Sequence, residues 1–237
     1  MIMKGKRGLI MGVANDRSIS WGIAKKIASE GAEIAFTYQV EALKKRVEPL
    51  AKSIGSSILI PCDVTDSLSM ENTFEIIKKE WGDIDFLVHG IGFSNKDELR
   101  GKYYNTSSEN FNQTMHVSCY SFTEACRLAE PIMNEGGSIL TLTYFGSEQV
   151  MPHYNVMGVA KAALEASVRY LAVDMGEKNI RVNAIAPGLT ETDMMKNSTP
   201  ENVLQETLKR IPLNRVGSPD EIANVVLFLS SDLSNYI

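Results

Sequence analysis

The chain has 237 residues, enough for one α/β domain that buries a substantial core. Apolar residues make up 44% of it, and no apolar run reaches the length of about 18 residues that a membrane span requires. The formal net charge of −5 argues against nucleic acid as the main partner, and the start MIMKGKRGLIMG has too short an apolar stretch for a secretory signal.

Short apolar runs that are typical of buried strands alternate with amphipathic helical stretches. The strands are expected at 8–12, 32–38, 57–64, 85–90, 138–143 and 180–187. Three helices are expected between the first strands, and two longer ones near 108–130 and 155–176. This alternation predicts an α/β fold, a Rossmann-type doubly wound parallel sheet with helices on both faces. Without a repeat or an interdomain linker, residues 1–237 are expected to form a single dinucleotide-binding and catalytic domain.

A glycine turn separates the first strand from the first helix. Gly12, Ser18 and Gly22 lie in GVANDRSISWG. Such a turn lets the backbone approach a pyrophosphate, and the following helix N-terminus offers free N–H groups to it. The spacing differs from the common G-x-G-x-x-G, so on its own the motif also fits a plain turn before a helix.

The second strand ends in FTYQ, at the position that faces the adenosine ribose in dinucleotide folds. Gln39 is neutral and can hydrogen-bond a ribose hydroxyl, although a solvated loop glutamine is the alternative. No arginine stands directly at the strand end, but Lys44, Lys45 and Arg46 follow on the helix. This pattern favours NADH over NADPH.

The next two strand ends add further candidate cofactor contacts. Asp63 and Val64 follow the third strand, where a carboxylate and a backbone N–H would meet the adenine edge. Asp63 fits a turn or N-cap residue equally well. Gly90 and Gly92, at the end of the fourth strand, permit close backbone approach beside the ribose and nicotinamide.

Tyr154 and Lys161 are the strongest catalytic candidates. They are seven residues apart, which on a continuous helix is two turns and places both on one face. A lysine ammonium beside the phenol is expected to lower the tyrosine pKa and make it a usable proton donor. Lys161 can also bind ribose hydroxyls. The alternative is a core tyrosine and a surface lysine with this spacing by chance.

This Tyr-x6-Lys pair and the glycine turn resemble the short-chain dehydrogenase/reductase family. Within it, GVANDRSISWGIA, FTYQ, HGIGF, LTLTYFG and YNVMGVAKAALEASVRYLAVDMGEKNIRVNAI resemble bacterial enoyl-acyl-carrier-protein reductases, from about residue 4 to 185. The tyrosines Tyr144 and Tyr154, ten residues apart and followed by NVMG, are the more specific part of this resemblance.

The resemblance implies a reaction of fatty acid biosynthesis in the cytoplasm. NADH would deliver hydride to the β-carbon of a trans-2-enoyl thioester on acyl carrier protein. Tyr154 would hydrogen-bond or protonate the enolate-like oxygen, Tyr144 would flank the acyl chain, and Lys161 would hold the ribose. The family habit is a homotetramer built through the two long helices, without a metal.

The same resemblance assigns the remaining site residues. Ser94 would lie near the substrate. The residues expected to contact the cofactor are Gly12, Ser18, Ile19, Gln39, Asp63, Val64, Ile91 and Lys161, with Thr190 and Thr192 from the loop after the sixth strand.

Ketoreductases of the family use a serine thirteen residues before the tyrosine, where this chain has Thr141, and an asparagine near the position of His116. His116, His89 and His153 are interpreted as structural. The hydroxyl of Thr141 could replace the serine, so a 3-oxoacyl-carrier-protein reductase or another carbonyl reductase stays open. A non-catalytic dinucleotide-binding protein is the third hypothesis.

The C-terminal segment departs from the enoyl reductase pattern. After Ile185, PGLTETDM and RIPLNRVGSPDEIANVVLFLSSDLSNYI resemble the 3-oxoacyl-carrier-protein reductase branch, and Glu191 takes an otherwise basic position. The chain stops at Ile237, where family members continue through a last strand and a Gly-rich tail, which suggests a truncated or hybrid sequence. The cysteines are odd in number and widely spaced, so we expect reduced thiols rather than disulfides; they are Cys62, Cys119 and Cys126.

Overall fold

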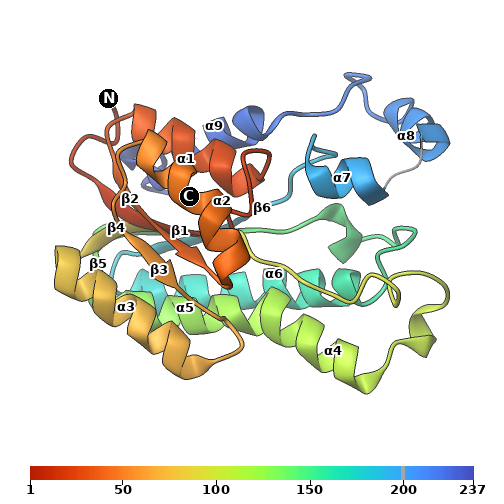
Figure 1. Ribbon diagram of the computed structural model, residues 1–237, viewed down its shortest axis with the longest axis horizontal. Coiled ribbons are helices and arrows are strands. Elements are labelled where there is room, and N and C mark those ends of the chain that lie inside the picture. Colours follow the sequence, from red (N-terminus) through yellow and green to blue (C-terminus); the bar gives the residue numbers. More distant parts are fainter. Residues whose placement is uncertain (199–200) are drawn as a thin grey trace.

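The apolar runs of the sequence form one parallel sheet. The computed structural model describes residues 1–198 and 201–237, and in this part of the chain the strand order is β3-β2-β1-β4-β5-β6, with every neighbouring pair parallel (Figure 1). The strands are β1 (Arg7–Met11), β2 (Glu33–Tyr38), β3 (Leu59–Pro61), β4 (Ile84–His89), β5 (Met133–Leu142) and β6 (Arg181–Ile185). The doubly wound Rossmann-type fold predicted from the alternation is confirmed.

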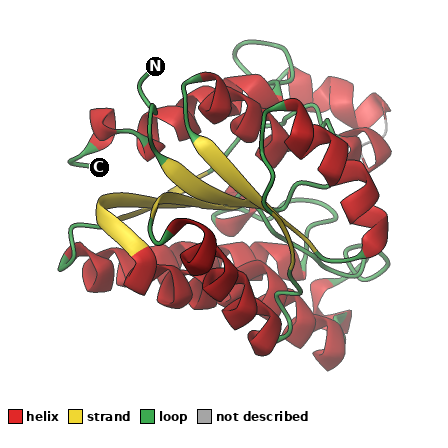
Figure 2. Cartoon of the chain, turned by 60° about the vertical axis from the view of Figure 1, so that its left-hand side comes forward, coloured by secondary structure: helices red, strands yellow, loops and turns green. Residues whose placement is uncertain are grey.

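Helices cover both faces of this sheet (Figures 1 and 2). One face carries α1 (Ile19–Ser29), α2 (Glu41–Ser53) and α9 (Pro219–Ser230). The other carries α3 (Ser67–Trp81), α4 (Ser108–Met115), α5 (Ser121–Ala129) and α6 (Val156–Gly176). Two helices lie beyond the carboxyl end of β6, namely α7 (Asp193–Ser198) and α8 (Glu201–Leu208). Single 3-10 turns occur at Tyr103–Asn105, Glu130–Ile132, Phe145–Ser147 and Asp232–Ser234.

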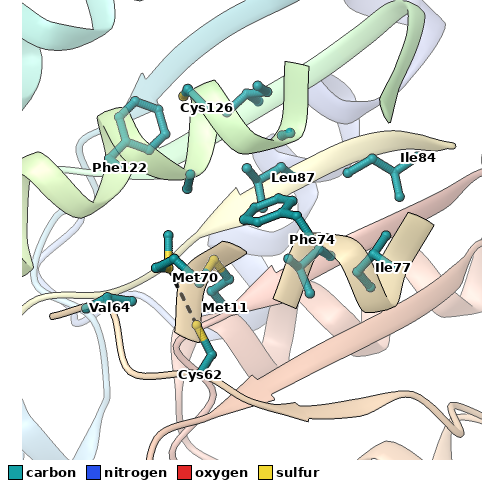
Figure 3. Close-up of a cluster of buried hydrophobic side chains, with 14 of the residues drawn as sticks. Met11, Cys62, Val64, Met70, Phe74, Ile77, Ile84, Leu87, Phe122 and Cys126 are labelled. Carbon is teal, nitrogen blue, oxygen red and sulfur yellow. Dashed lines mark hydrogen bonds between the residues drawn. The ribbon is translucent and has the colours of Figure 1, made fainter. Parts of the chain in front are cut away.

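Each strand contributes to two hydrophobic cores because successive side chains point to opposite faces. Leu87 faces α3 and α5, where it lies with Met70, Phe74 and Phe122 (Figure 3), and Leu9 belongs to the same cluster. The alternate strand residues pack against α1, α2 and α9; they include Ile10, Phe36, Phe86, Val88 and Leu140. Burial on both faces explains why the strands are almost continuously apolar.

The cysteines belong to the first of these cores. All three are free and buried, as predicted, and the Sγ of Cys62 lies 3.5 Å from the Sδ of Met70 (Figure 3). Burial raises the pKa of Cys126, so its thiol stays protonated. In the described part of the chain no helix is long and apolar enough to cross a membrane.

The long helix expected near 108–130 is interrupted. A π-helical turn, His116–Tyr120, separates α4 from α5. Ser121 in the following turn donates its hydroxyl to the Val117 carbonyl at 2.7 Å, and the hydroxyl of Ser118 bonds outside the helix. The apolar pattern alone does not reveal such an insertion, because it shifts the helix register by only one residue.

The strand β5 begins earlier than the sequence pattern predicts. The strand begins at Met133 rather than near residue 138, and Gly136, at φ +80°, lies inside it. The pairing with β4 shifts register between Ile84 and Phe86. A glycine pair in a polar stretch is typical of a loop, so the sequence pattern concealed this irregular first half.

Candidate active site

The strand order reverses direction between β1 and β4, and in parallel sheets of this order the crevice that binds ligands lies at the carboxyl ends of these two strands. Gly12 follows β1 at φ +92°, and a Cβ on it would lie 2.1 Å from the carbonyl oxygen of Gly90. A Cβ on Gly90 would lie 2.1 Å from the Oγ of Ser20. Neither position has room for a side chain, because the turn after β1, the turn after β4 and Ser20 pack closely together here.

Ser18 shapes the turn between β1 and α1. Its Oγ accepts hydrogen bonds from the backbone N–H of Ala14 at 3.0 Å and of Asn15 at 3.1 Å. Although Ser18 is the N-cap residue of α1, its side chain makes no capping bond to that helix. The Ser18 side chain therefore does not compete for the N–H groups at the start of α1, although the N–H of Trp21 donates to the Ser18 carbonyl at 3.0 Å.

The residues expected at the adenosine come together. The Nε2 of Gln39 donates to the Oδ2 of Asp63 at 3.2 Å. Asp63 also accepts from the backbone N–H and the hydroxyl of Thr65, so it is a turn residue as well. Burial alone would raise the pKa of Asp63, but the hydrogen bonds from Thr65 and Gln39 outweigh it and the pKa is lowered. Val64 is buried beside this pair.

Tyr144 and Tyr154 form one aromatic pair. Their ring centroids are 5.0 Å apart and the rings meet edge to face at 67°. A Cβ on Gly146 would lie 2.5 Å from the Cδ1 of Tyr154, so glycine is required beneath the ring. The turn that holds Gly146 is fixed by Glu165, whose Oε1 accepts from the hydroxyls of neighbouring Thr143 and Ser147.

Tyr154 does not lie on the helix with Lys161, so the predicted common helix face is wrong. The helix α6 begins at Val156, and Tyr154 is in the preceding turn. His153 and Asn155 have φ values of +60° and +36°, which end any helical conformation on both sides of the tyrosine. In this turn the Tyr154 ring packs against Tyr144.

Lys161 is buried, with only 6% of its surface exposed, and its Nζ donates to the carbonyl oxygen of Leu142 at 2.8 Å. Burial lowers the pKa of Lys161 to about 8. Burial raises the pKa of Tyr154, and Tyr144 raises it further. The expected lowering of the tyrosine pKa by lysine is therefore wrong for this structure: Tyr154 is a neutral phenol.

The segment after β4 is held by a polar stripe that the sequence interpretation missed. The stripe consists of residues four apart on the inner face of α4 and the π-helical turn, all buried: Asn110, Thr114 and Ser118. Ser118 Oγ accepts from the N–H of Phe93 at 2.9 Å and donates to the Phe93 carbonyl at 3.0 Å. Polar residues at i, i+4 and i+8 in a buried helix were the available signal.

The same stripe fixes Ser94. The hydroxyl of Thr114 donates to Ser94 Oγ at 2.9 Å, and Ser94 donates to the Oδ1 of Asn110 at 3.3 Å. Ser94 is buried, so its hydroxyl supports the loop. Gly92 lies next to Lys161, because a Cβ on Gly92 would be 3.7 Å from the lysine Nζ. The backbone from Ile91 onward therefore borders the lysine.

The histidines at the strand ends are structural, as interpreted. His89 is fully buried, and burial together with the charge of Lys161 lowers its pKa to about 3. Its Nε2 lies 2.9 Å from the Oγ of Ser121. His116 Nε2 lies 3.2 Å from the Val64 carbonyl oxygen. His116 therefore links the π-helical turn to the segment after β3.

Thr141 bonds to the neighbouring strand. It is fully buried in β5, and its hydroxyl donates to the carbonyl oxygen of His89 at 3.1 Å. This contact joins β4 and β5 and uses the one proton that the Thr141 hydroxyl can donate.

The two threonines of the loop after β6 hold that loop in shape. The hydroxyl of buried Thr190 donates to the Gly188 carbonyl at 2.9 Å. The hydroxyl of Thr192 accepts from the N–H of Met195 at 3.2 Å, within the first turn of α7. Glu191 forms an ion pair with Lys196 at 2.7 Å. The structure therefore gives both threonines partners within their own loop.

Asp193 joins this loop to the glycine turn, which the sequence did not indicate. Its carboxylate accepts from the Nδ2 of Asn15 and from Arg17, both at 2.8 Å. Asn15 and Arg17 belong to the turn that faces the crevice, so α7 is tied to one wall of it. Separately, among residues 1–198 and 201–237, no three metal-ligating side chains gather.

The site combines three features: a glycine turn at the switch point of a parallel sheet, a buried lysine and a paired tyrosine. Together they are typical of a dinucleotide-dependent dehydrogenase or reductase of the short-chain class. Residues 12–237 match the family described as enoyl-(acyl carrier protein) reductase. The chain belongs to this family. The match includes the segment after Ile185 that resembles another branch.

Individual relatives agree with the family. The chain is 56% identical over 235 residues to enoyl-acyl-carrier-protein reductase (NADH) 1 of Rhizobium meliloti, covering 99% of this chain and 86% of that one. It is 47% identical to the Bacillus subtilis enoyl-acyl-carrier-protein reductase (NADH) FabI, covering 99% and 92%. The crystal structure of the Anaplasma phagocytophilum reductase in complex with NAD has a TM-score of 0.93 and 51% identity, covering 100% of this chain and 89% of that one.

Proposed function

We propose that this protein is an NADH-dependent enoyl-acyl-carrier-protein reductase of fatty acid biosynthesis, which reduces the trans-2 double bond of an enoyl thioester. The relatives of that name align with almost the whole chain. The observation that carries the proposal is the edge-to-face pair of Tyr144 and Tyr154, together with the Thr141 hydroxyl that donates to the His89 carbonyl.

NADH, when bound, supplies the hydride for the β-carbon of the enoyl thioester. Tyr154, as a neutral phenol, donates a hydrogen bond to the thioester carbonyl oxygen and stabilises the negative charge that develops there. Tyr144 packs against the Tyr154 ring and flanks the acyl chain. Lys161, positioned by the Leu142 carbonyl, would bind the hydroxyls of the cofactor ribose.

The cofactor-binding residues proposed for this chain follow the crevice from one strand end to the next. The glycine turn would hold the pyrophosphate, Gln39 the adenosine ribose, and Asp63 with Val64 the adenine edge. Ile91 would lie beside the nicotinamide ribose, with Thr190 and Thr192 on the opposite wall. Ser94 would contribute to the substrate site through its loop. These assignments are supported by the positions of the residues at the strand ends.

A carbonyl reductase is the second candidate, favoured by the residues of the C-terminal segment. The decisive experiment supplies purified protein with NADH or NADPH and with a crotonyl or an acetoacetyl thioester. We expect faster oxidation of NADH with the crotonyl thioester. Faster turnover of the acetoacetyl thioester would refute the enoyl reductase assignment. Cofactor binding without turnover of either thioester would indicate a non-catalytic dinucleotide-binding protein.

A homotetramer is proposed for the assembly, with α6 at one interface. The outward face of α6 exposes Tyr170 at 77% and Val173 at 74%, and Tyr120 of the π-helical turn is also half exposed. Apolar side chains at helical spacing on one face are typical of a helix that packs against a partner. Light scattering after size exclusion tests this, because a monomer of 26.2 kDa would contradict it.

The partner and the location complete the proposal. The substrate is the enoyl thioester carried on acyl carrier protein, and neither nucleic acid nor a membrane is a partner. A cytoplasmic location is supported by three free thiols, which are typical of a reducing compartment. Fractionation of cells with an antibody against the protein would test the location.

A further inference from the structure

Asn155, the residue directly after Tyr154, has an unusual backbone conformation. Its φ is +36° and its ψ is −120°, outside the regions that residues other than glycine readily adopt. Backbone strain of this kind persists where the surrounding contacts impose it, and it is concentrated at functional sites. The contacts of the Asn155 side chain therefore indicate what the strained turn does.

Asn155 occupies the N-cap position of α6 but does not cap the helix. Asparagine is favoured at N-caps because its side-chain oxygen accepts a bond from the N–H of the second or third helical residue. Asn155 makes no such bond. Its Nδ2 donates instead to the backbone carbonyls of Glu98 at 3.2 Å and Gly101 at 3.4 Å. The amide thus reaches a loop more than fifty residues earlier in the chain.

That loop is also tied to the start of α4. The carboxylate of Glu98 accepts from the N–H and the hydroxyl of Ser107, at 2.7 Å and 2.9 Å, where α4 begins. The loop start is fixed by the polar stripe through Ser94. The Asn155 amide is therefore a direct link between residues 98–101 and the turn that carries Tyr154.

We propose that Asn155 is a positioning residue, whose side-chain amide holds the 98–101 loop against the catalytic turn and thereby orients the Tyr154 phenol. This inference deepens the proposed function and rests on it. The helix gives up its side-chain cap, and the backbone adopts an unfavourable φ, so that the amide faces the loop. Asn155 acts through Tyr154 and needs no contact with substrate.

Three substitutions separate the amide from the backbone. Asn155→Gly tolerates the positive φ but removes the side-chain amide. Asn155→Ala removes the amide and tolerates the positive φ poorly. Asn155→Asp keeps the size of the side chain but removes its N–H donor. We expect all three to lower kcat with the crotonyl thioester by about tenfold or more, because small misplacement of a catalytic group has a large effect. The Kd of NADH should change less than about twofold in each, since the glycine turn is distant in sequence and separately held.

Asn179→Ala is the matched control. Asn179 also has a positive φ, +59°, and follows the other end of α6. It should lose stability as Asn155→Ala does while keeping kcat. Recovery of wild-type kcat in Asn155→Gly would overturn the proposal, because the backbone conformation alone would then matter.

Hydrogen exchange of the peptide covering residues 96–104 gives a readout that does not require turnover. We expect faster exchange there in Asn155→Gly and Asn155→Asp than in the wild type or Asn179→Ala. Unchanged exchange would overturn the proposal even if the wild type reduces the thioester. If the wild type fails to reduce it while exchange responds as expected, the proposed function fails and the structural link stands.

Discussion

Lys161→Met is the substitution whose effect on stability can be worked out most fully from the structure. The ammonium of Lys161 is buried and has one hydrogen-bond partner, the carbonyl of Leu142. Burial lowers its pKa from the ordinary 10.5 to about 8, so the unfolded chain binds this proton more tightly than the folded chain does. Stability should therefore rise with pH between the two pKa values.

The shift fixes the magnitude. A pKa difference of 2.5 units, from 10.5 to about 8, corresponds to a penalty of about 3 kcal/mol when the lysine is charged. The penalty is fully present below the folded pKa and disappears as the pH approaches the unfolded pKa. Integration of the proton linkage shows that this penalty decreases by about 1.3 kcal/mol between about pH 7 and about pH 9. The Lys161→Met variant has no ionisable group at this position, so its stability lacks this pH dependence.

Urea unfolding of both proteins at a series of pH values measures this. We expect the free energy of unfolding of the wild type, measured relative to that of Lys161→Met, to increase by about 1.3 kcal/mol between about pH 7 and about pH 9. The Leu142 carbonyl loses its donor in the variant, but that loss does not depend on pH. Lys96→Met, at an exposed loop lysine, should run parallel to the wild type. A pH-independent difference between the wild type and Lys161→Met would refute the reasoning.

Four other predictions concern the tyrosine pair and the loops around it. Tyr154→Phe should lower kcat about 100-fold and leave the NADH Kd unchanged, with a smaller effect for Tyr144→Phe; steady-state kinetics and NADH fluorescence measure this. Because the pKa of Tyr154 is raised, kcat should show no loss from tyrosine ionisation below about pH 10. Gly146→Ala should lower kcat, because its Cβ would collide with the Tyr154 ring, whereas Gly176→Ala, which meets nothing within 4 Å, should not. Ser118→Ala should reduce the free energy of unfolding by about 1–3 kcal/mol, measured in urea, because it leaves two backbone groups unpaired.

The fold was predictable because burial of a parallel sheet on both faces demands continuous apolar strands, and all six runs became strands. The same physics located the crevice, since the ends of parallel strands share one edge. Gln39 and Asp63 came together for this reason. Residues whose place depends only on the sheet order were thus accessible from the sequence.

The local geometry of the catalytic turn was not predictable from spacing. A seven-residue separation suggests two helical turns, but the positive φ values of His153 and Asn155 take Tyr154 off the helix. Lys161 then pairs with a backbone carbonyl rather than with the phenol. The contact of Asp193 with the glycine turn joins residues far apart in sequence, and no pattern along the chain encodes it.

The orientation of Thr141 separates the two reductase hypotheses on chemical grounds. In a ketoreduction, hydride adds to the carbon that carries the oxygen, and a second hydroxyl beside the tyrosine helps to hold that carbonyl. In an enoyl reduction, hydride adds to the β-carbon, and the charge appears on an oxygen farther along the conjugated chain, where one well-placed donor suffices. Here the hydroxyl of Thr141 is committed to the His89 carbonyl inside the sheet. The Tyr144 and Tyr154 rings meet edge to face, and the neutral Tyr154 phenol is the donor that this reaction requires.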